Sequence, residues 1–236
     1  MAARIKPRYW AYRKLRAAMS NRTLAYRAID HNTGRQKLFN GLTDPDFPSA
    51  LASGNFVYVD NGYFDRPHHF RLIRDNVHLT TLLDRPGDRW ERLGIKLRPW
   101  RRNGEHIVVI PPSPWYVELL KAEKWLANAR NQLAQHTGRQ IVIKHGKGQL
   151  EEALQRAWAV VTYGSVAGLE AAILGVPVFS GPICPTLPIS AGTLDAIENP
   201  VLQERGPWLH SLAYANWRVS EIPKIHLEDY NYTCAS

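Results

Sequence analysis

The stretch VVTYGSVAGLEAAILGVPVF, residues 160–179, decides the fold of this chain. The segment 157–163 is largely apolar, which is typical of a parallel strand buried on both faces. Gly164 and Ser165 then open a helix of small residues that ends at Gly175, and residues 176–179 are predicted to form the next strand. The stretch predicts a strand–helix–strand unit, which on physical grounds alone is also compatible with a generic α/β crossover.

The segments before this unit predict a larger parallel sheet. Residues 106–110 and 141–144 are predicted strands, and residues 115–136 and 150–157 are predicted helices. Strands and helices thus alternate from residue 105 onward, which predicts a parallel sheet whose ligands bind beyond the carboxyl ends of the strands. Ser113, Lys144-His145 and Gly164-Ser165 each follow a strand, so we expect them on one rim.

Residues 105–181 resemble the donor-binding unit of GT-B glycosyltransferases, which have two Rossmann-like domains and use nucleotide sugars. That family has a hydrophobic strand, a Ser- or Gly-bearing turn, a helix with an early Glu, and Gly-x-Pro-Val. The resemblance implies that Gly164 and Ser165 contact the donor diphosphate and that Glu170 bonds the ribose hydroxyls. It also implies a metal-independent reaction with a nucleotide sugar, expected to be a UDP-sugar, as co-substrate and no other cofactor.

Two neighbouring segments have a donor role and an alternative one. The loop carrying Ser113 meets the donor phosphates in the resembling family, but Ser113 is equally suited to capping the following helix. Lys144 offers a cation to the diphosphate, and the family places a basic or histidine-containing segment such as Lys144-His145 beside the nucleotide base. The alternative for Lys144 and His145 is an exposed turn.

The candidate base for acceptor activation lies in the N-terminal half. Asp60 ends a predicted strand, residues 55–60, and a carboxylate there is able to take the proton of an acceptor hydroxyl. Asp60 is also suited to capping the Asn61-Gly62 turn. His68 and His69 are the alternative bases or acceptor contacts, or else exposed loop residues.

Positive charge is concentrated in two clusters before residue 105. The chain has a formal net charge of +9. Residues 4–27 contain eight Lys or Arg and no acid, and the second cluster interleaves Trp90 and Trp100 with Arg85, Arg89, Arg92, Lys96, Arg98, Arg101 and Arg102. Such patches favour a polyanion, either nucleic acid or an anionic membrane surface, with a solvated basic face as the alternative.

Other properties of the chain narrow its class. Hydrophobic residues make up 44% of the sequence, which is typical of a globular protein. No apolar run approaches the ~20 residues of a membrane span, and the first residues lack the apolar core of a signal peptide. The chain has two cysteines, which predicts no disulfide framework, and no zinc-site spacing occurs. We therefore expect a cytoplasmic protein without stable membrane insertion and without a bound metal.

These observations predict an α/β protein of GT-B type. We expect a reduced acceptor-binding domain over residues 1–104, a Rossmann-type donor domain over 105–204, and a C-terminal helix with its tail over 205–236 that packs back on the body. Small size, basic clusters and interleaved tryptophans resemble phage-type enzymes that glycosylate hydroxymethylated bases of DNA, which would place the protein in the host cytoplasm. The alternatives are a glycosyltransferase acting on a cell-surface glycan or lipid-linked sugar, and a non-catalytic nucleic-acid-binding module.

Overall fold

The computed structural model describes residues 37–40, 45–54, 56–66, 68–146, 150–218 and 221. These residues form two compact units. One unit combines the described residues up to Val77 with those from His210 onward, and the other is His78–Leu209. The chain thus divides after Val77, whereas the sequence predicted a boundary after residue 104. The expected N-terminal helix, residues 8–28, and the basic cluster of residues 4–27 lie outside the described residues.

The unit His78–Leu209 is built on a four-stranded parallel sheet, as the sequence predicted. Its strands are β4 (His106–Ile110), β5 (Gln140–Ile143), β6 (Ala157–Thr162) and β7 (Val178–Ser180), in the order β5-β4-β6-β7. The connecting helices are α4 (Pro114–Leu120), α5 (Trp125–His136), α6 (Leu150–Leu154) and α7 (Ala167–Ile173), and α3 (Asp88–Leu93) precedes β4. Two short 3-10 helices follow β7, η1 (Leu187–Ile189) and η2 (Leu194–Ala196).

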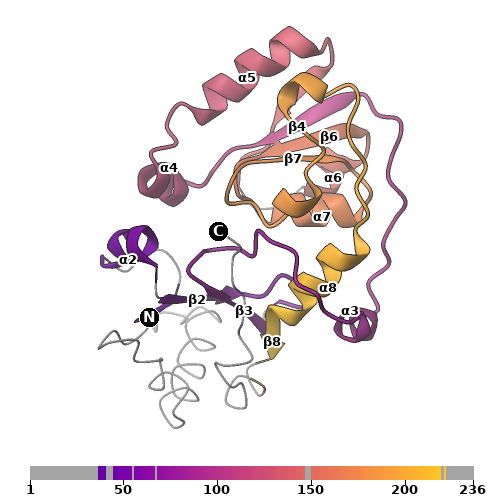
Figure 1. The fold of residues 1–236 in the computed structure, drawn as a ribbon. Helices are drawn as coiled ribbons and strands as arrows, with labels where there is room; N and C mark the ends of the chain where they lie inside the picture. The colour runs from indigo at the N-terminus through magenta and orange to yellow at the C-terminus, as the bar shows by residue number, and fades with distance from the viewer. Residues whose placement is uncertain are drawn as a thin grey trace, which may run out of the picture. The chain divides into compact units, whose positions relative to one another are not determined.

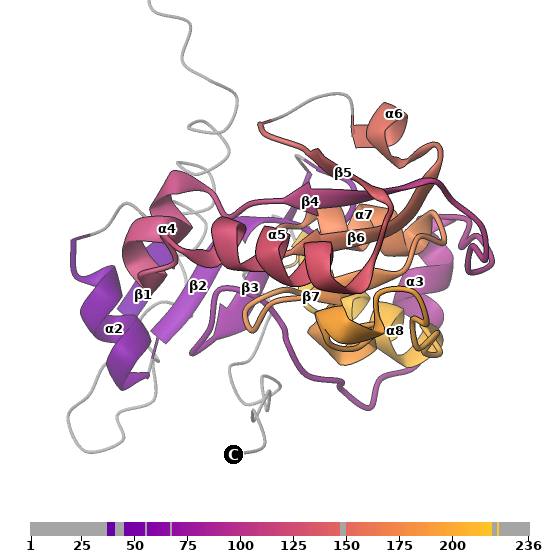
Figure 2. The same ribbon diagram turned by 90° about the horizontal axis from the view of Figure 1, so that it is seen from above.

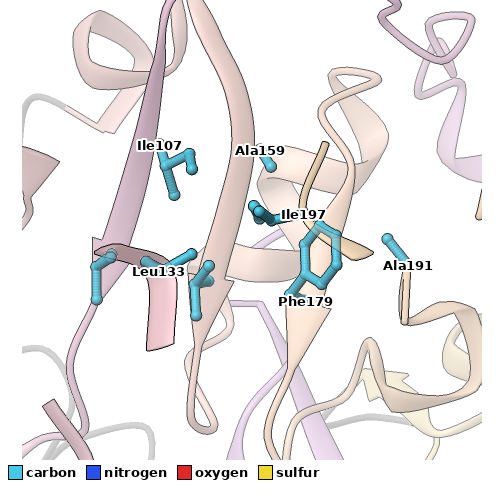
Figure 3. Packing of buried hydrophobic residues seen from close by; sticks show 8 residues of the cluster. Ile107, Leu133, Ala159, Phe179, Ala191 and Ile197 are labelled. Carbon is cyan, nitrogen blue, oxygen red and sulfur yellow. The ribbon is translucent and has the colours of Figure 1, made fainter. Parts of the chain in front are cut away.

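Helices cover both faces of this sheet, which explains its continuous apolar strands. Successive strand residues point to opposite faces. One face carries Ile107, Val109, Ala159, Val161 and Phe179, which pack around Leu133 of α5 (Figure 3). The other face carries Thr162 and Val178, which lie against Gly168 of α7. Figures 1 and 2 show α5 and α7 on opposite sides of the strands.

The sequence prediction of one helix over residues 115–136 is wrong. The chain forms α4 and α5 with a break between them, because Lys121 adopts a left-handed conformation with φ 52° and ends α4. The N–H of Ala122 then donates to the carbonyl of Val117. The break lets α5 begin at Trp125, next to the carboxyl end of β6, where the Trp125 ring contacts Tyr163 edge to face.

The other unit is a smaller mixed sheet with strand order β1-β2-β3-β8. Its strands are β1 (Lys37–Asn40), β2 (Phe56–Asn61), β3 (His69–Arg74) and β8 (Asn216–Arg218), and only the β1–β2 pair is parallel. Helix α2 (Phe47–Ser53) packs Phe47 on Phe56 and Tyr58, each at a ring-centroid distance of 5.5 Å. Together the two units make a mixed α/β protein.

The C-terminal segment differs from the expected single helix over residues 206–219. Helix α8 (Gly206–Tyr214) ends before Ala215, and residues 216–218 form β8. β8 pairs antiparallel with β3, with Phe70 opposite Trp217. β8 therefore pairs with a strand that lies roughly 150 residues earlier in the chain, and loop-closure entropy opposes pairing at such a separation.

Candidate functional site

The strand order of the parallel sheet identifies its ligand-binding edge. From β4 the chain moves to β5 on one side, and it then crosses to β6 on the other side of β4. The order reverses between β4 and β6, whose last residues Ile110 and Thr162 are register partners. Open α/β sheets bind their ligands at the carboxyl ends of the two strands that flank such a reversal. We call this end of the sheet the carboxyl edge.

Ser113 and the Gly164-Ser165 turn follow the two strands that flank this reversal, as the sequence predicted. Ser113 caps α4: its Oγ accepts a hydrogen bond from the N–H of Tyr116 at 3.4 Å. The capping role predicted as one alternative is therefore confirmed, and contact with a phosphate remains a prediction.

Ser165 is held by hydrogen bonds within its own turn. Its N–H donates to Thr162 Oγ1 at 3.3 Å, and its Oγ accepts from the N–H of Ala167 at 3.2 Å. A diphosphate at this turn would therefore bind the backbone N–H groups of Gly164 and Val166, for which the described residues supply no acceptor.

Gly164 has a packing role of its own. A Cβ at this position would lie 2.6 Å from Cδ1 and 2.7 Å from Cγ1 of Ile183, which is closer than real contacts allow. The side chain of Ile183 thus occupies the space beside Gly164. The glycine is needed for the approach of the loop after β7, whether or not a phosphate binds nearby.

Lys144 and His145 follow β5 at the same edge. The N–H of Lys144 donates to the carbonyl of Val109 in β4, which fixes the start of this loop. Lys144 Nζ donates to the carbonyls of His145 and Gly146 at 3.0 and 3.1 Å, so the ammonium group lies over its own loop. His145 is exposed. Rotation about their side-chain torsions would bring Lys144 and His145 toward a ligand at the carboxyl edge.

Glu170 lies on α7 with its side chain exposed, whereas its neighbours Leu169 and Ala171 are buried. Within the described part of the chain, no cation or hydrogen-bond donor engages the Glu170 carboxylate. The carboxylate is thus exposed, and its contact with ribose remains a prediction.

The carboxyl edge also carries a pocket of ≈ 500 Å³ that the sequence did not reveal. The pocket lies between α5 and the segment after β7 and reaches the last residues of β6 and β7. It is lined by Trp125, Gln132, Gln135, His136, Val161, Thr162, Phe179, Ser180, Gly181, Gly192, Thr193, Leu194 and Asp195. The spacing of apolar residues in α5 predicts an amphipathic helix. The local sequence is the same whether the polar face of such a helix lines a pocket or faces solvent.

Asp60, the first candidate base, is part of an ion pair in the smaller unit. Its Oδ2 lies 3.2 Å from Nη2 of Arg71, its directly opposite partner on β3, and accepts from the hydroxyl of Tyr58 at 3.3 Å. Oδ1 accepts from the N–H of Asn61 at 2.7 Å. Arg71 is only 4% exposed, so Asp60 neutralises a buried cation. This position gives Asp60 a structural role, and its service as a base remains a prediction.

His69 and His68 differ sharply in their surroundings. His69 is buried, with Nδ1 3.1 Å from Asp65 Oδ2 and Nε2 accepting from Arg218 Nε at 3.4 Å. The His68 side chain is 74% exposed and lies 3.4 Å from the same carboxylate of Asp65. A carboxylate that orients an imidazole is the usual support of a histidine base. His69 is therefore the better oriented of the two, but Arg218 engages its Nε2, so its service as a base remains a prediction.

Three arginines of the predicted nucleic-acid cluster lie at the amino ends of the parallel strands, the opposite end from the carboxyl edge. The N–H of Arg98 donates to the carbonyl of Ile173 at the end of α7, and the N–H of Arg101 donates to that of Gly175, just before β7. Arg102 lies in the same segment, directly before β4. The structure therefore does not bring Arg98, Arg101 and Arg102 together with the donor-site candidates.

The side chain of Arg101 has a structural role. Its Nη1 donates to the carbonyls of Leu154 and Ala157 at 2.7 and 2.9 Å, at the start of β6. Burial, followed by the nearby charge of Arg98, lowers the pKa of Arg101. Arg98 and Arg102 have exposed side chains.

Arg85 and Arg89 lie nearer the beginning of the same unit. Arg85 Nη1 donates to the carbonyl of Asp84 at 3.0 Å, and Arg89 lies in α3. Both side chains are half-buried and engaged by neighbouring residues. Their contact with nucleic acid remains a prediction.

Within the described ranges, the structure contains no cluster of His, Cys, Asp and Glu suited to a metal ion. None of the helices in those ranges has both the length and the apolar composition of a transmembrane helix. No family model, curated protein or solved structure matches the chain.

Proposed function

We propose that this protein is a glycosyltransferase that binds a nucleotide sugar, expected to be a UDP-sugar, at the carboxyl edge of the parallel sheet. One observation carries the proposal: the strand order reverses between β4 and β6, and the two loops at that reversal carry Ser113 and Gly164-Ser165. This is where sheets of this type bind nucleotides. That the protein has a fold of GT-B type is part of this proposal.

The groups at this edge suit the parts of such a donor. The backbone N–H groups of Gly164 and Val166 would bind the diphosphate, and the Lys144 ammonium would exchange its carbonyl partners for phosphate oxygens. Glu170, exposed on α7, would accept hydrogen bonds from the ribose hydroxyls. Stabilising the charge of the leaving diphosphate would lower the barrier to sugar transfer without the need for a metal ion.

For the acceptor we propose a hydroxymethylated base in DNA. The support is the net charge of +9 and its concentration before residue 105. An enzyme acting on such a base would flip it out of the duplex. Asp60 or His69 would accept the proton of the hydroxymethyl group; Asp65 orients the His69 imidazole, and Arg218 would have to release its Nε2 first.

A second acceptor class, a cell-surface glycan or lipid-linked sugar, is favoured by one observation. Arg98 and Arg102, the exposed arginines of the segment before β4, lie at the end of the sheet opposite the proposed donor site. In this location they would not hold a duplex against the donor. The DNA proposal then depends on Arg85, Arg89 and the basic residues 4–27.

One experiment tests both proposals. The purified protein is incubated with a panel of nucleotide sugars and with hydroxymethylated duplex DNA, and the digested nucleosides are examined by mass spectrometry. The DNA proposal predicts a hexose-sized mass increase on the modified nucleoside. Release of nucleoside diphosphate with no mass increase on DNA would support the glycan acceptor, and no turnover of any donor would contradict the glycosyltransferase proposal.

A further inference from the structure

The pocket beside α5 has an electrostatic character unlike that of a phosphate site. Its lining contains no Lys or Arg, and its ionisable residues are Asp195 and His136. A hydrogen bond from the Thr193 hydroxyl, together with the Asp195 backbone, lowers the pKa of the Asp195 carboxyl, with a smaller contribution from His136. Asp195 therefore stays negatively charged at neutral pH and disfavours an anion in the pocket.

The pocket wall is apolar on one side. Trp125 is half-buried and is supported by Tyr163, whose ring lies 5.7 Å away at 70°. Val161, Phe179 and Leu194 complete this surface. The indole and its support offer a flat surface of the kind that the C–H face of a ring covers.

The polar groups come from several sides of the pocket. Gln132 and Gln135 project from α5, Asp195 lies in η2, and η2 packs beside α5. Both glutamines are exposed, and the described residues supply no hydrogen-bond partner for their amides. An amide both donates and accepts, and a carboxylate accepts, so together they suit hydroxyl groups distributed around a ring.

We infer that this pocket binds a neutral sugar ring, with one ring face on Trp125 and hydroxyl groups on Gln132 and Asp195. A pocket of ≈ 500 Å³ is within the range of small-molecule sites. The inference rests on the pocket lining and not on the proposed transfer reaction, so each can fail without the other.

The test uses the full-length protein and four free sugars: D-glucose, D-galactose, D-mannose and N-acetyl-D-glucosamine. Saturation-transfer difference NMR detects binding at millimolar concentration, and uridine and inorganic phosphate serve as comparison ligands. We expect at least one sugar to bind with a millimolar Kd, with the C–H protons of one ring face saturated more strongly than those of the other face or an acetyl group. Neither uridine nor phosphate should displace it.

Five variants locate the bound sugar. Gln132→Ala and Asp195→Asn change exposed side chains and should each raise Kd about tenfold, the usual consequence of losing one hydrogen bond. Asn131→Ala, on the same helix but outside the pocket lining, is the matched control and should leave Kd unchanged. Trp125→Ala should abolish binding, whereas Trp115→Ala, a 52% exposed tryptophan on α4, should not.

Three results would overturn the inference. The first is that none of the four sugars binds. The second is that a sugar binds but Gln132→Ala and Asp195→Asn bind it like Asn131→Ala. The third is that uridine competes for the same site, which would identify the pocket as one for a nucleobase.

Discussion

The carboxylate of Asp60 and the guanidinium of Arg71 face each other across the β2–β3 pair, with Oδ2 and Nη2 3.2 Å apart. Arg71 also donates to the carbonyls of Asn61 and Val77, at 2.9 and 3.2 Å. Its guanidinium carbon lies 5.5 Å from the ring centroids of Tyr58 and of Tyr63. A buried arginine with these contacts is stabilised by the nearby carboxylate of Asp60.

Replacing Asp60 with Asn should therefore destabilise the protein. The change removes the carboxylate charge of Asp60 from the buried guanidinium of Arg71, which costs about 3 kcal/mol of unfolding free energy. Urea denaturation measures the loss, and Asp84→Asn, at an exposed position, is the control. An unchanged unfolding midpoint in Asp60→Asn would contradict the ion pair. If Asp60 also serves as the base, kcat of the folded variant should fall by ~10²–10⁴.

Gly164→Ala should lower the melting temperature because its Cβ would press on Ile183. Overpacking of this kind costs about 1–3 kcal/mol. Ile183→Ala in the same chain should restore much of the loss, which makes the pair of variants diagnostic. When Gly164→Val is combined with Ile183→Ala instead, it should abolish sugar transfer if the turn binds the diphosphate. Full transfer there would remove Gly164 from the donor site.

Arg101→Ala and Arg102→Ala should separate a structural arginine from a surface one. Arg101→Ala removes two hydrogen bonds to the carbonyls of Leu154 and Ala157 and should lower the unfolding free energy by about 1–2 kcal/mol. Arg102→Ala should change it by less than about 0.5 kcal/mol. If exposed arginines contact duplex DNA, Arg98→Ala with Arg102→Ala should flatten the salt dependence of binding by roughly 0.9 per lost phosphate contact. Equal stability of the two single variants would contradict the Arg101 contacts.

Glu170→Gln should weaken binding of the nucleotide-sugar donor without a change in stability. Loss of a hydrogen bond to a charged group costs about 1.5–3 kcal/mol, and the exposed side chain has no structural partner among the described residues. Calorimetric titration gives the affinity, and Glu151→Gln, an exposed glutamate on α6, is the matched control. Equal donor affinity in the two variants would remove Glu170 from the site.

The elements with a strong periodic pattern could be predicted from the sequence. The strand at residues 106–110 and the helix that follows Gly164-Ser165 appear where expected, because their apolar residues are buried on defined faces. The break at Lys121 could not be predicted, since no Gly or Pro marks it and the left-handed residue is a lysine. β8 was also missed, because Trp217 continues the helical spacing of Leu209 and Leu212 and only pairing with β3 makes it a strand.

The candidate site shows the same limit. Which strands flank the reversal follows from the order of elements, so Ser113 and Gly164 could be placed on one edge from the sequence. The role of Arg101 depends on carbonyls more than fifty residues away, and local composition does not distinguish it from its exposed neighbour Arg102. The pocket at Trp125 arises from the packing of η2 beside α5, which only the folded chain reveals.

The β3–β8 pairing has a consequence for how the protein folds during synthesis. β3 leaves the ribosome before residues 78–209 are made, whereas its partner at residues 216–218 is made after them. The amide side chain of Asn216, which bonds the backbone of Phe64 in both directions, arrives equally late. The parallel sheet, by contrast, is encoded in one contiguous segment. We therefore expect residues 78–209 to become structured first, while β3 keeps an unpaired edge until β8 has been made.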